Sequence, residues 1–230
     1  MNGAPLAFYD LDGTLVSSNV VTQYAWFARR QPGRRRAAAD MGKLLLSVPL
    51  LIALDLCSRR LFNEFFYRYY RGMSEQFLAE SAPAMFEAVL LPAIYPGAMA
   101  LVESDRHAGF RTVLVTGSLD FALEPVRRHF GFDDLLCNRL VFEGGLATGA
   151  IVPPVLAGPE KVNAIRELCR KYNVETAECK AYSDSLSDLP MLDAVGFPVA
   201  ANPDRRLRRI ARLRGWPVLD LKRNQHVHAN

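Results

Sequence analysis

The sequence predicts an α/β protein with a Rossmann-like, three-layer core built on a parallel sheet. Short apolar segments typical of buried strands occur near 6–9, 112–116 and 181–183, and each is followed by small or acidic polar residues. Helical patterns alternate with the later strands, which favours a parallel sheet covered by helices on both faces. Residues 17–95 show helical periodicity and no convincing strand. We therefore expect an all-helical insertion directly after the first strand.

Within this insertion, turn and cap residues divide the predicted helices. Pro32-Gly33 separates a helix at Val20–Arg30 from a longer one at Arg34–Arg60, because Pro and Gly both interrupt helices. Leu61–Tyr70 is rich in aromatic residues. Ser74 is expected to begin a further helix, since its side chain can accept hydrogen bonds from the free amides of the first turn.

Strands and helices alternate after Pro96-Gly97. We expect, in order, a helix near Ala98–Ala108, a strand to Thr116, a helix from about Leu119 to Phe130, a hairpin with arms Leu140–Phe142 and Ala150–Val152, a helix from about Glu160 to Tyr172, a strand to Ser183, a helix near Leu189–Val195 and a strand near Phe197–Ala200. An Arg-rich stretch between Arg205 and Arg214 follows on one predicted helix.

Asp10 and Asp12 are the strongest candidates for a functional site. They stand two residues apart at the end of an apolar strand, where alternate side chains share a face and where open α/β sheets bind their ligands. Two such acids repel each other unless a cation lies between them or one keeps its proton. The pair therefore suits either a Mg²⁺ site or an acid–base pair. A calcium-binding loop is excluded because Leu15 and Val16 follow in place of further acids.

Three more motifs follow in the order found in a known family. Thr116-Gly117-Ser118 ends a second buried strand, Lys161 follows Gly158-Pro159 at the start of a helix, and Ala181–Asp188 ends a third strand with two more acids. Together with Phe8–Leu15, these motifs resemble those of the haloacid dehalogenase-like (HAD) hydrolases. The branch they resemble most is the phosphoserine phosphatase-like one, subfamily IB. The similarity covers nearly the whole chain except much of residues 17–95.

The resemblance implies a HAD fold with a catalytic core at 1–16 and 96–230 and an all-helical C1-type cap at 17–95. It also implies a Mg²⁺-dependent phosphomonoesterase that acts through an aspartyl-phosphate. Asp10 would be the nucleophile and Asp12 the general acid and base, with Thr116, Gly117 and Lys161 contacting the phosphate. The metal residues implied are Asp10, Asp12, Asp184 and Asp188, with Asp12 acting through its backbone carbonyl and Asp188 supporting either the metal's waters or Lys161.

The substrate is less constrained than the reaction. Asn19 stands where phosphoserine phosphatases typically carry a Glu for the substrate ammonium, and Leu61–Arg71 shows no clear counterpart of their carboxylate-binding Arg. The aromatic residues of that segment, Phe66 among them, are either cap core or a pocket wall suited to an apolar or choline-like leaving group. We thus expect Asn19, Phe66 and Gly117 to contact a small or lysophospholipid-like phosphate ester. A phosphoserine phosphatase proper and a non-catalytic phospholigand- or membrane-surface-binding protein remain alternatives.

The apolar run from Leu44 to Leu56 is shorter than the roughly 20 residues of a membrane-spanning helix. We expect it to form a buried helix of the insertion. The alternative is a surface that meets lipid weakly, because several arginines precede the run and basic residues beside an apolar helix favour anionic membranes. These arginines are Arg29, Arg30, Arg34, Arg35 and Arg36.

Composition limits the remaining function classes. The 230 residues suffice for a core and an insertion, and the net charge of +4 is only mildly basic. No aromatic residues alternate with the arginines of 205–214, so nucleic-acid binding is not expected. The four cysteines form no Cys-x-x-Cys pair, and the chain reaches its first strand too soon for a signal peptide, so we expect a cytoplasmic protein. His226 and His228 are not expected to form a metal site, and the oligomeric state stays open.

Overall fold

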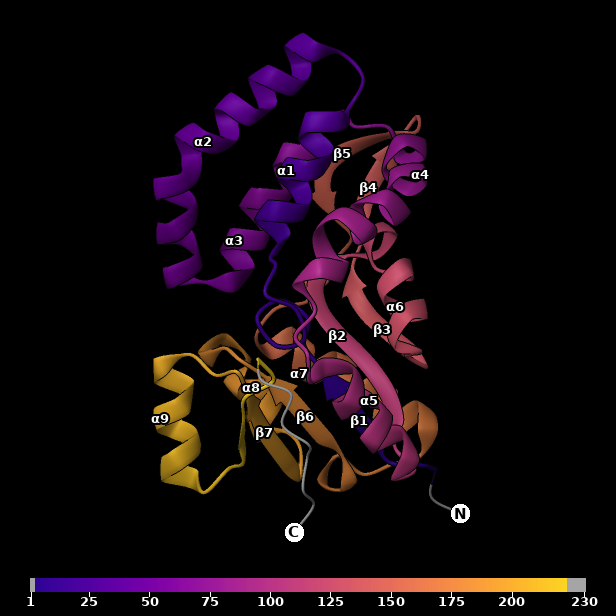
Figure 1. Cartoon of the computed structure of the whole chain (residues 1–230), viewed down its shortest axis with the longest axis vertical. Helices are drawn as coiled ribbons and strands as arrows, with labels where there is room; N and C mark the ends of the chain where they lie inside the picture. Colours follow the sequence, from indigo (N-terminus) through magenta and orange to yellow (C-terminus); the bar gives the residue numbers. More distant parts are fainter. Residues whose placement is uncertain (1–2, 223–230) are drawn as a thin grey trace.

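A computed structural model describes residues 3–222. Its core is a six-stranded, entirely parallel sheet in the order β3-β2-β1-β6-β7-β8, as the fold class predicted (Figure 1). The strands are β1 (Leu6–Tyr9), β2 (Arg111–Leu119), β3 (Asp134–Asn138), β6 (Lys180–Ser183), β7 (Phe197–Ala201) and β8 (Val218–Leu219). Two further strands, β4 (Leu140–Glu143) and β5 (Leu146–Ile151), form the expected antiparallel hairpin. His226 and His228 lie outside the described residues.

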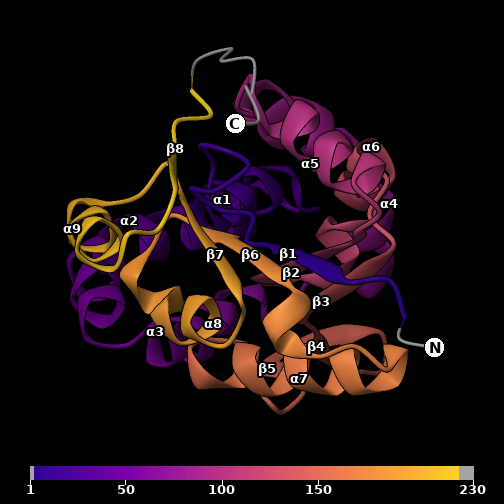
Figure 2. The ribbon, with the colours of Figure 1, turned by 90° about the horizontal axis from the view of Figure 1, so that it is seen from below.

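Helices cover both faces of the sheet (Figure 2). Alternate residues of β1 point to opposite faces, so that Ala7 and Tyr9 belong to one apolar cluster and Leu6 and Phe8 to another. The first cluster includes side chains of α5 (Ala98–His107) and α6 (Glu124–Phe130). The second includes side chains of α7 (Pro159–Tyr172), α8 (Leu189–Asp193) and α9 (Arg205–Arg214). Burial on both faces explains why these strands are continuously apolar.

Helices also fill the chain between Val20 and Ala93. They are α1 (Val20–Arg30), α2 (Arg34–Cys57), α3 (Arg59–Phe66) and α4 (Glu75–Met85), followed by a π-helical turn at Phe86–Leu90 and a 3₁₀ turn at Leu91–Ala93. Ser74 caps α4 as expected, because its hydroxyl accepts from the Phe77 N–H. The aromatic side chains of α1 and α3 pack on one another in the apolar cluster that also covers one face of the sheet. We keep 17–95 as the proposed cap boundary.

Two predicted helices and two predicted strands have other bounds than expected, since β2 continues to Leu119 and β5 begins at Leu146, and β3 and β8 were not predicted. The helix expected at Arg34–Arg60 ends at Cys57, because Ser58 is extended and its side chain caps α3. The helix expected from Leu119 begins instead as a 3₁₀ turn, and α6 starts only at Glu124. β3 was not predicted as a strand, because it is a short segment that runs almost directly into the hairpin.

The prediction of burial for Leu44–Leu56 is wrong. Only Leu44 and Leu51 of α2 are buried, whereas Leu46 is 86% and Leu56 is 73% exposed. The apolar run alone is too short to span a membrane, but it belongs to a helix of 24 residues. By length and composition α2 is long and apolar enough to cross a membrane, with only 11% of its most apolar window buried. Helix α2 stands at the edge of the molecule beside α1 and α3 (Figure 1).

Candidate active site

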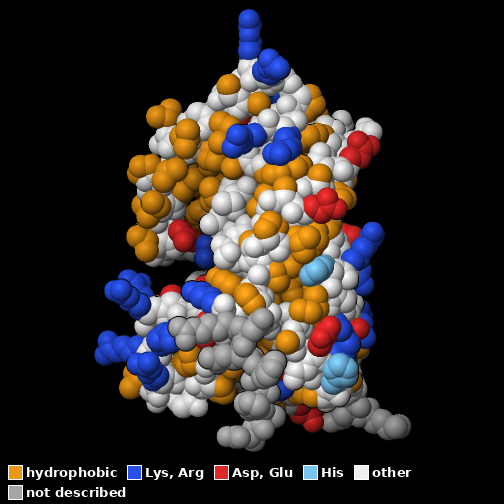
Figure 3. Space-filling model, viewed as in Figure 1, with side chains coloured by type: hydrophobic (Ala, Val, Ile, Leu, Met, Phe, Trp, Pro, Cys, Tyr) orange, Lys and Arg blue, Asp and Glu red, His pale blue; other side chains and the backbone are white. Residues whose placement is uncertain are grey.

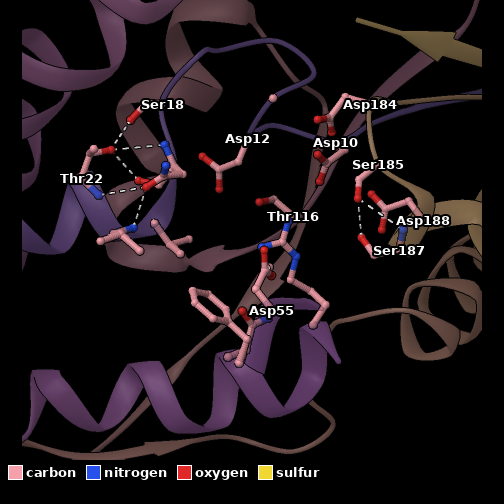
Figure 4. Close-up of a pocket in the computed structure, with 18 of the residues that line it drawn as sticks. Asp10, Asp12, Ser18, Thr22, Asp55, Thr116, Asp184, Ser185, Ser187 and Asp188 are labelled. Carbon is pink, nitrogen blue, oxygen red and sulfur yellow. Dashed lines mark hydrogen bonds and ion pairs between the residues drawn. The ribbon is translucent and has the colours of Figure 1, made fainter. Parts of the chain in front are cut away.

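The motif residues meet at the carboxyl ends of three adjacent strands (Figure 4). Asp10 directly follows β1, Thr116 lies in β2, and Asp184 directly follows β6. Since β2, β1 and β6 are neighbours and parallel, their ends lie at one edge of the sheet. Lys161 reaches the same edge from the first turn of α7. Sequence motifs up to 174 residues apart thus converge on one cavity.

Lys161 joins two of the carboxylates. Its Nζ donates to Asp10 Oδ1 and to Asp188 Oδ2, each at 2.8 Å, and the residue is only 5% exposed. Burial alone would lower the pKa of Lys161, but the two carboxylates outweigh it and raise that pKa. The lysine is therefore a fixed positive charge beside Asp10. Asp188 Oδ2 also accepts from the Ser183 hydroxyl at 2.8 Å, so its carboxylate is fixed between Ser183 and Lys161.

Asp10 and Asp184 face each other across Thr14. The Thr14 hydroxyl lies 3.2 Å from Asp10 Oδ2 and 3.2 Å from Asp184 Oδ1, and it can donate its proton to only one of them. Gly13 has φ +87°, and a Cβ there would lie 2.2 Å from Asp184 Oδ2. Burial, and then the charge of Asp10, raises the pKa of Asp184 to about 8, and burial likewise raises that of Asp10. The raised pKa values mean that the positive charge of Lys161 does not fully offset the negative charge of these two buried carboxylates.

This pair fits a Mg²⁺ ion. No group of three or more His, Cys, Asp or Glu side chains within residues 3–222 is arranged to hold a metal by itself. Mg²⁺ does not need one, because it is usually held by one or two carboxylates together with waters and substrate phosphate oxygens. Of the four predicted metal residues, the geometry favours the side chains of Asp10 and Asp184. These two carboxylates face each other across Thr14, whereas that of Asp12 is held by Ser118 and Gln23 and that of Asp188 by Lys161 and Ser183.

Asp12 has different neighbours from Asp10. Its carboxylate accepts from the Ser118 hydroxyl at 2.9 Å and from Gln23 Nε2 at 3.2 Å. Burial, followed by the charge of Asp10, raises the pKa of Asp12 to about 7. A carboxyl group with such a pKa can both donate and accept a proton near neutrality. Gln23 comes from α1, and no local signal in the sequence marked it.

Side chains of Tyr67, Asn138 and Asn63 surround Gly117 in the Thr116-Gly117 segment. The Gly117 carbonyl accepts from the Tyr67 hydroxyl at 2.6 Å and from Asn138 Nδ2 at 2.7 Å. A Cβ at Gly117 would lie 2.9 Å from Asn63 Nδ2, so only glycine fits without displacement. The Asn63 amide nitrogen is buried at the cavity wall and has no hydrogen-bond partner within residues 3–222. It is therefore free to donate to a bound ligand.

A cavity of about 550 Å³ lies over these residues. Its far wall comes from α1, α2 and α3 and is mainly apolar, with one ion pair. The apolar lining residues are Val20, Val21, Val48, Leu51, Ile52 and Phe62. The pair is Asp55 with Arg59, whose carboxylate and guanidinium lie 2.7 Å apart. An arginine of the insertion therefore does face the site, just outside the Leu61–Arg71 segment in which none was recognised.

Two predicted substrate contacts differ in outcome. Asn19 lines the cavity, but its side-chain oxygen accepts from the Val21 and Thr22 N–H groups and so caps α1. Phe66 does not line the cavity: it is fully buried and stacks on Phe62, which does. The prediction of Phe66 as a pocket residue is wrong because Phe66 lies one helical turn beyond Phe62 on the same face of α3, where its ring packs on Tyr24 and Tyr67.

Similarity to known proteins agrees with this geometry. A protein of Streptomyces azureus named as an inhibition of morphological differentiation protein is 35% identical over 94% of this chain and 78% of its own length. A probable phosphatase of Mycobacterium tuberculosis is 31% identical over 94% of this chain and 75% of its own. A histidinol-phosphatase of Neisseria meningitidis is 28% identical over 94% and 99%, respectively.

Two solved structures share the fold. A Bordetella pertussis protein of unknown function superposes with a TM-score of 0.81 at 29% identity, covering 95% of this chain and 99% of that one. An apo phosphoserine phosphatase gives 0.71 at 15% identity over 96% and 95%, which supports the fold alone. The family model for the haloacid dehalogenase-like hydrolases matches residues 7–193. On this match, as its four motifs predicted, the chain belongs to the haloacid dehalogenase-like hydrolases.

Proposed function

We propose that this hydrolase is a Mg²⁺-dependent phosphomonoesterase that acts through an aspartyl-phosphate on Asp10. The observation that carries the proposal is the different environment of its two neighbouring acids. Asp10 is paired with Lys161, while Asp12 is bonded to neutral groups and has a pKa of about 7. When the environments of two neighbouring carboxyl groups differ in this way, one group can act as the nucleophile and the other as the acid–base residue.

In the first step, an oxygen of the Asp10 carboxylate attacks phosphorus and the bond from phosphorus to the leaving oxygen breaks. Protonated Asp12 gives its proton to that oxygen, so the product leaves as an alcohol. Lys161, the Thr116 hydroxyl and the Gly117 N–H stabilise the phosphoryl oxygens. The unpartnered Asn63 amide is a further donor at the same wall.

In the second step, water attacks the phosphorus of the acyl phosphate and Asp12 takes the proton that the water loses. The bond between phosphorus and the Asp10 oxygen then breaks, which releases inorganic phosphate and restores the carboxylate. A Mg²⁺ ion held by Asp10 and Asp184 would offset the negative charge of the phosphoryl group and the carboxylates. Phosphoryl transfer depends chiefly on such positioning and charge stabilisation.

The cavity supports a small phosphate ester with a partly apolar leaving group. Val48, Ile52 and Phe62 would contact the apolar part, and the Asp55–Arg59 pair offers one charge of each sign. The relative named for histidinol phosphate is consistent with a small substrate. A lipid-related ester is the second candidate, because α2 carries exposed leucines beside the cavity residues.

The proposal is tested by hydrolysis of an aryl phosphate with Mg²⁺ and with excess chelator. Asp10→Asn should stay folded by circular dichroism and lose all but a few per cent of activity, whereas Asp220→Asn, at an exposed acid away from the cavity, should be unaffected. Full activity in chelator would remove the metal from the proposal. A folded wild type that binds phosphate but hydrolyses nothing would favour the non-catalytic alternative.

Substrate preference needs a separate comparison. We would measure kcat/KM for phosphoserine, histidinol phosphate, phosphocholine and a short-chain lysophosphatidate. The apolar wall and Asn19 predict that phosphoserine is not preferred, since the Asp55–Arg59 pair, whose charges already satisfy each other, is the one charged feature of the wall formed by α1, α2 and α3 that its ammonium and carboxylate could meet. A tenfold or greater preference for phosphoserine would contradict this reading and assign Arg59 to its carboxylate.

A further inference from the structure

Helix α2 exposes an unusually apolar face. Leu45 and Leu46 are 67% and 86% exposed, and Leu45, Pro49, Ile52 and Leu56 recur at the spacing of one helical stripe. Asp55 is the only charged residue between Leu44 and Cys57. Soluble proteins rarely leave so many neighbouring leucines in water unless another surface covers them.

Positive charge flanks this apolar stripe at both ends. Arg34 and Arg35 are exposed in the first turn of α2, after the arginines that end α1. Helix α9 carries six arginines, of which only Arg214 forms an ion pair within residues 3–222. Figures 1 and 2 both place α9 on the same side of the molecule as α2. Figure 3 shows the apolar side chains of α2 between basic groups above and below.

We propose that this surface, the α2–α9 face, binds an anionic lipid bilayer with α2 lying in the membrane plane. The exposed leucines of α2 would enter the boundary between headgroups and acyl chains, and the arginines at the tip of α2 and on α9 would contact anionic headgroups. This combination of an apolar helix face with adjacent basic residues is the physical basis of interfacial membrane binding.

An in-plane helix fits the structure better than one that crosses the bilayer. Leu44 and Leu51 anchor α2 in the apolar cluster that contains α1 and α3, and Val48 and Ile52 line the cavity. Crossing a bilayer would pull these contacts apart and place Asp55 in hydrocarbon, at a high cost. A second copy of this chain is a less suitable partner for the α2–α9 face, because the arginines of one copy would lie against the arginines of the other.

The proposed membrane contact lies at the entrance to the catalytic site. A cleft of about 810 Å³ runs between α2 and α9, lined by residues 55–60 on one side and 204–206 on the other. It shares Asp55, Arg59, Ser185 and Ser187 with the catalytic cavity. A bilayer on the α2–α9 face would therefore lie next to the opening through which a substrate enters.

The test is flotation of the full chain with vesicles of phosphatidylcholine alone and of phosphatidylcholine mixed with phosphatidylglycerol. We expect binding to the mixed vesicles only, and release by high salt. The double variant Leu45→Glu/Leu46→Glu should bind at least about tenfold more weakly, because it puts charge into the apolar stripe. The control Leu146→Glu, an exposed leucine on the hairpin, should bind as the wild type does.

Charge is tested separately with Arg208→Gln/Arg209→Gln, which should also weaken binding. All variants should keep wild-type hydrolysis of an aryl phosphate, because none of these residues lines the cavity. Equal binding to neutral vesicles, or resistance to salt and alkaline carbonate, would overturn the proposal in favour of an inserted helix. Absence of binding to the mixed vesicles would overturn the proposal, and a dimer in sedimentation velocity that Leu45→Glu/Leu46→Glu dissociates would then assign the face to a second copy.

Discussion

Replacing Lys161 by Met should damage both stability and catalysis. Lys161 is nearly fully buried and makes two 2.8 Å ion pairs, with Asp10 and Asp188. Methionine keeps the length of the side chain but leaves both carboxylates without their cation. Breaking a buried pair by removing one partner typically costs about 3–5 kcal/mol. We expect the free energy of unfolding in chelator to fall by an amount in this range.

The same substitution should also slow catalysis strongly. A fixed positive charge next to the phosphoryl group stabilises the transition state, and loss of one such group costs about 10²–10³ in kcat. In aryl phosphate hydrolysis with saturating Mg²⁺, Lys161→Met should therefore lose at least about a hundredfold in kcat/KM. Urea unfolding of the same preparation gives the stability change independently.

Lys180 offers a matched control. Lys180 lies in β6 of the same sheet and does not line the cavity. Its Nζ lies 2.7 Å from Oδ1 of Asp105 on α5, and the Asp105 side chain is only 4% exposed. Lys180→Met should lower the unfolding free energy and leave kcat/KM unchanged. If Lys161→Met folds and keeps kcat/KM within threefold of the wild type, its charge plays no part in catalysis and the reasoning is refuted.

Three further outcomes are expected. Burial raises the pKa of Asp184 from 3.8 to about 8 in the folded protein, so the folded state holds this proton more tightly than the unfolded state does. The metal-free protein should therefore lose stability as the pH rises between these two values. Because Mg²⁺ binds the ionised carboxylate, it should raise the melting temperature more at pH 8 than at pH 6 in calorimetry. An equal rise at both would contradict this. Asn138→Ala, which removes a donor to Gly117, should lower kcat/KM roughly tenfold. Phe62→Ala should raise KM for an aryl phosphate, whereas Phe66→Ala should leave KM unchanged and cost about 3–5 kcal/mol of stability.

The parts of the site that the sequence predicted well are those with local signals. Asp10 and Asp184 each directly follow a short apolar strand and Thr116 lies in the last part of β2, and the fold brings these parallel strand ends together without further information. Lys161 was marked by the Gly-Pro before its helix. These positions depend on strand pairing and helix starts, which are encoded within a few residues.

Asp10 and Asp12 both reach the site, but strand alternation does not explain how their side chains are oriented. β1 ends at Tyr9, so the strand alternation used to place both acids no longer applies beyond it. The two carboxylates accordingly have different partners, Lys161 and Thr14 for the first and Ser118 for the second. The distinction matters more for function than the shared face, because it separates a nucleophile from an acid–base group.

Residues from the insertion were predicted least well. Gln23, Arg59 and Tyr67 reach the site through contacts between elements far apart in the chain, and each looks like an ordinary helix residue in the sequence. Phe66 was chosen for its aromatic ring, but a shift of four residues on one helix separates the cavity wall at Phe62 from the buried core. Side-chain type alone does not distinguish these two positions.

The misplacement of α2 shows why hydropathy is a weak guide to burial in an insertion. A leucine is buried only if another element supplies a surface against it, and α2 packs chiefly on α1 and α3. Leu44 and Leu51 satisfy those contacts, and the outward-facing leucines of α2 remain exposed to solvent within residues 3–222. Because Val48 and Ile52 line the cavity on the same helix, a surface that covers those leucines would also bear on the cavity. The lipid contact proposed above would account for the excess apolar character of α2, which packing within residues 3–222 does not require.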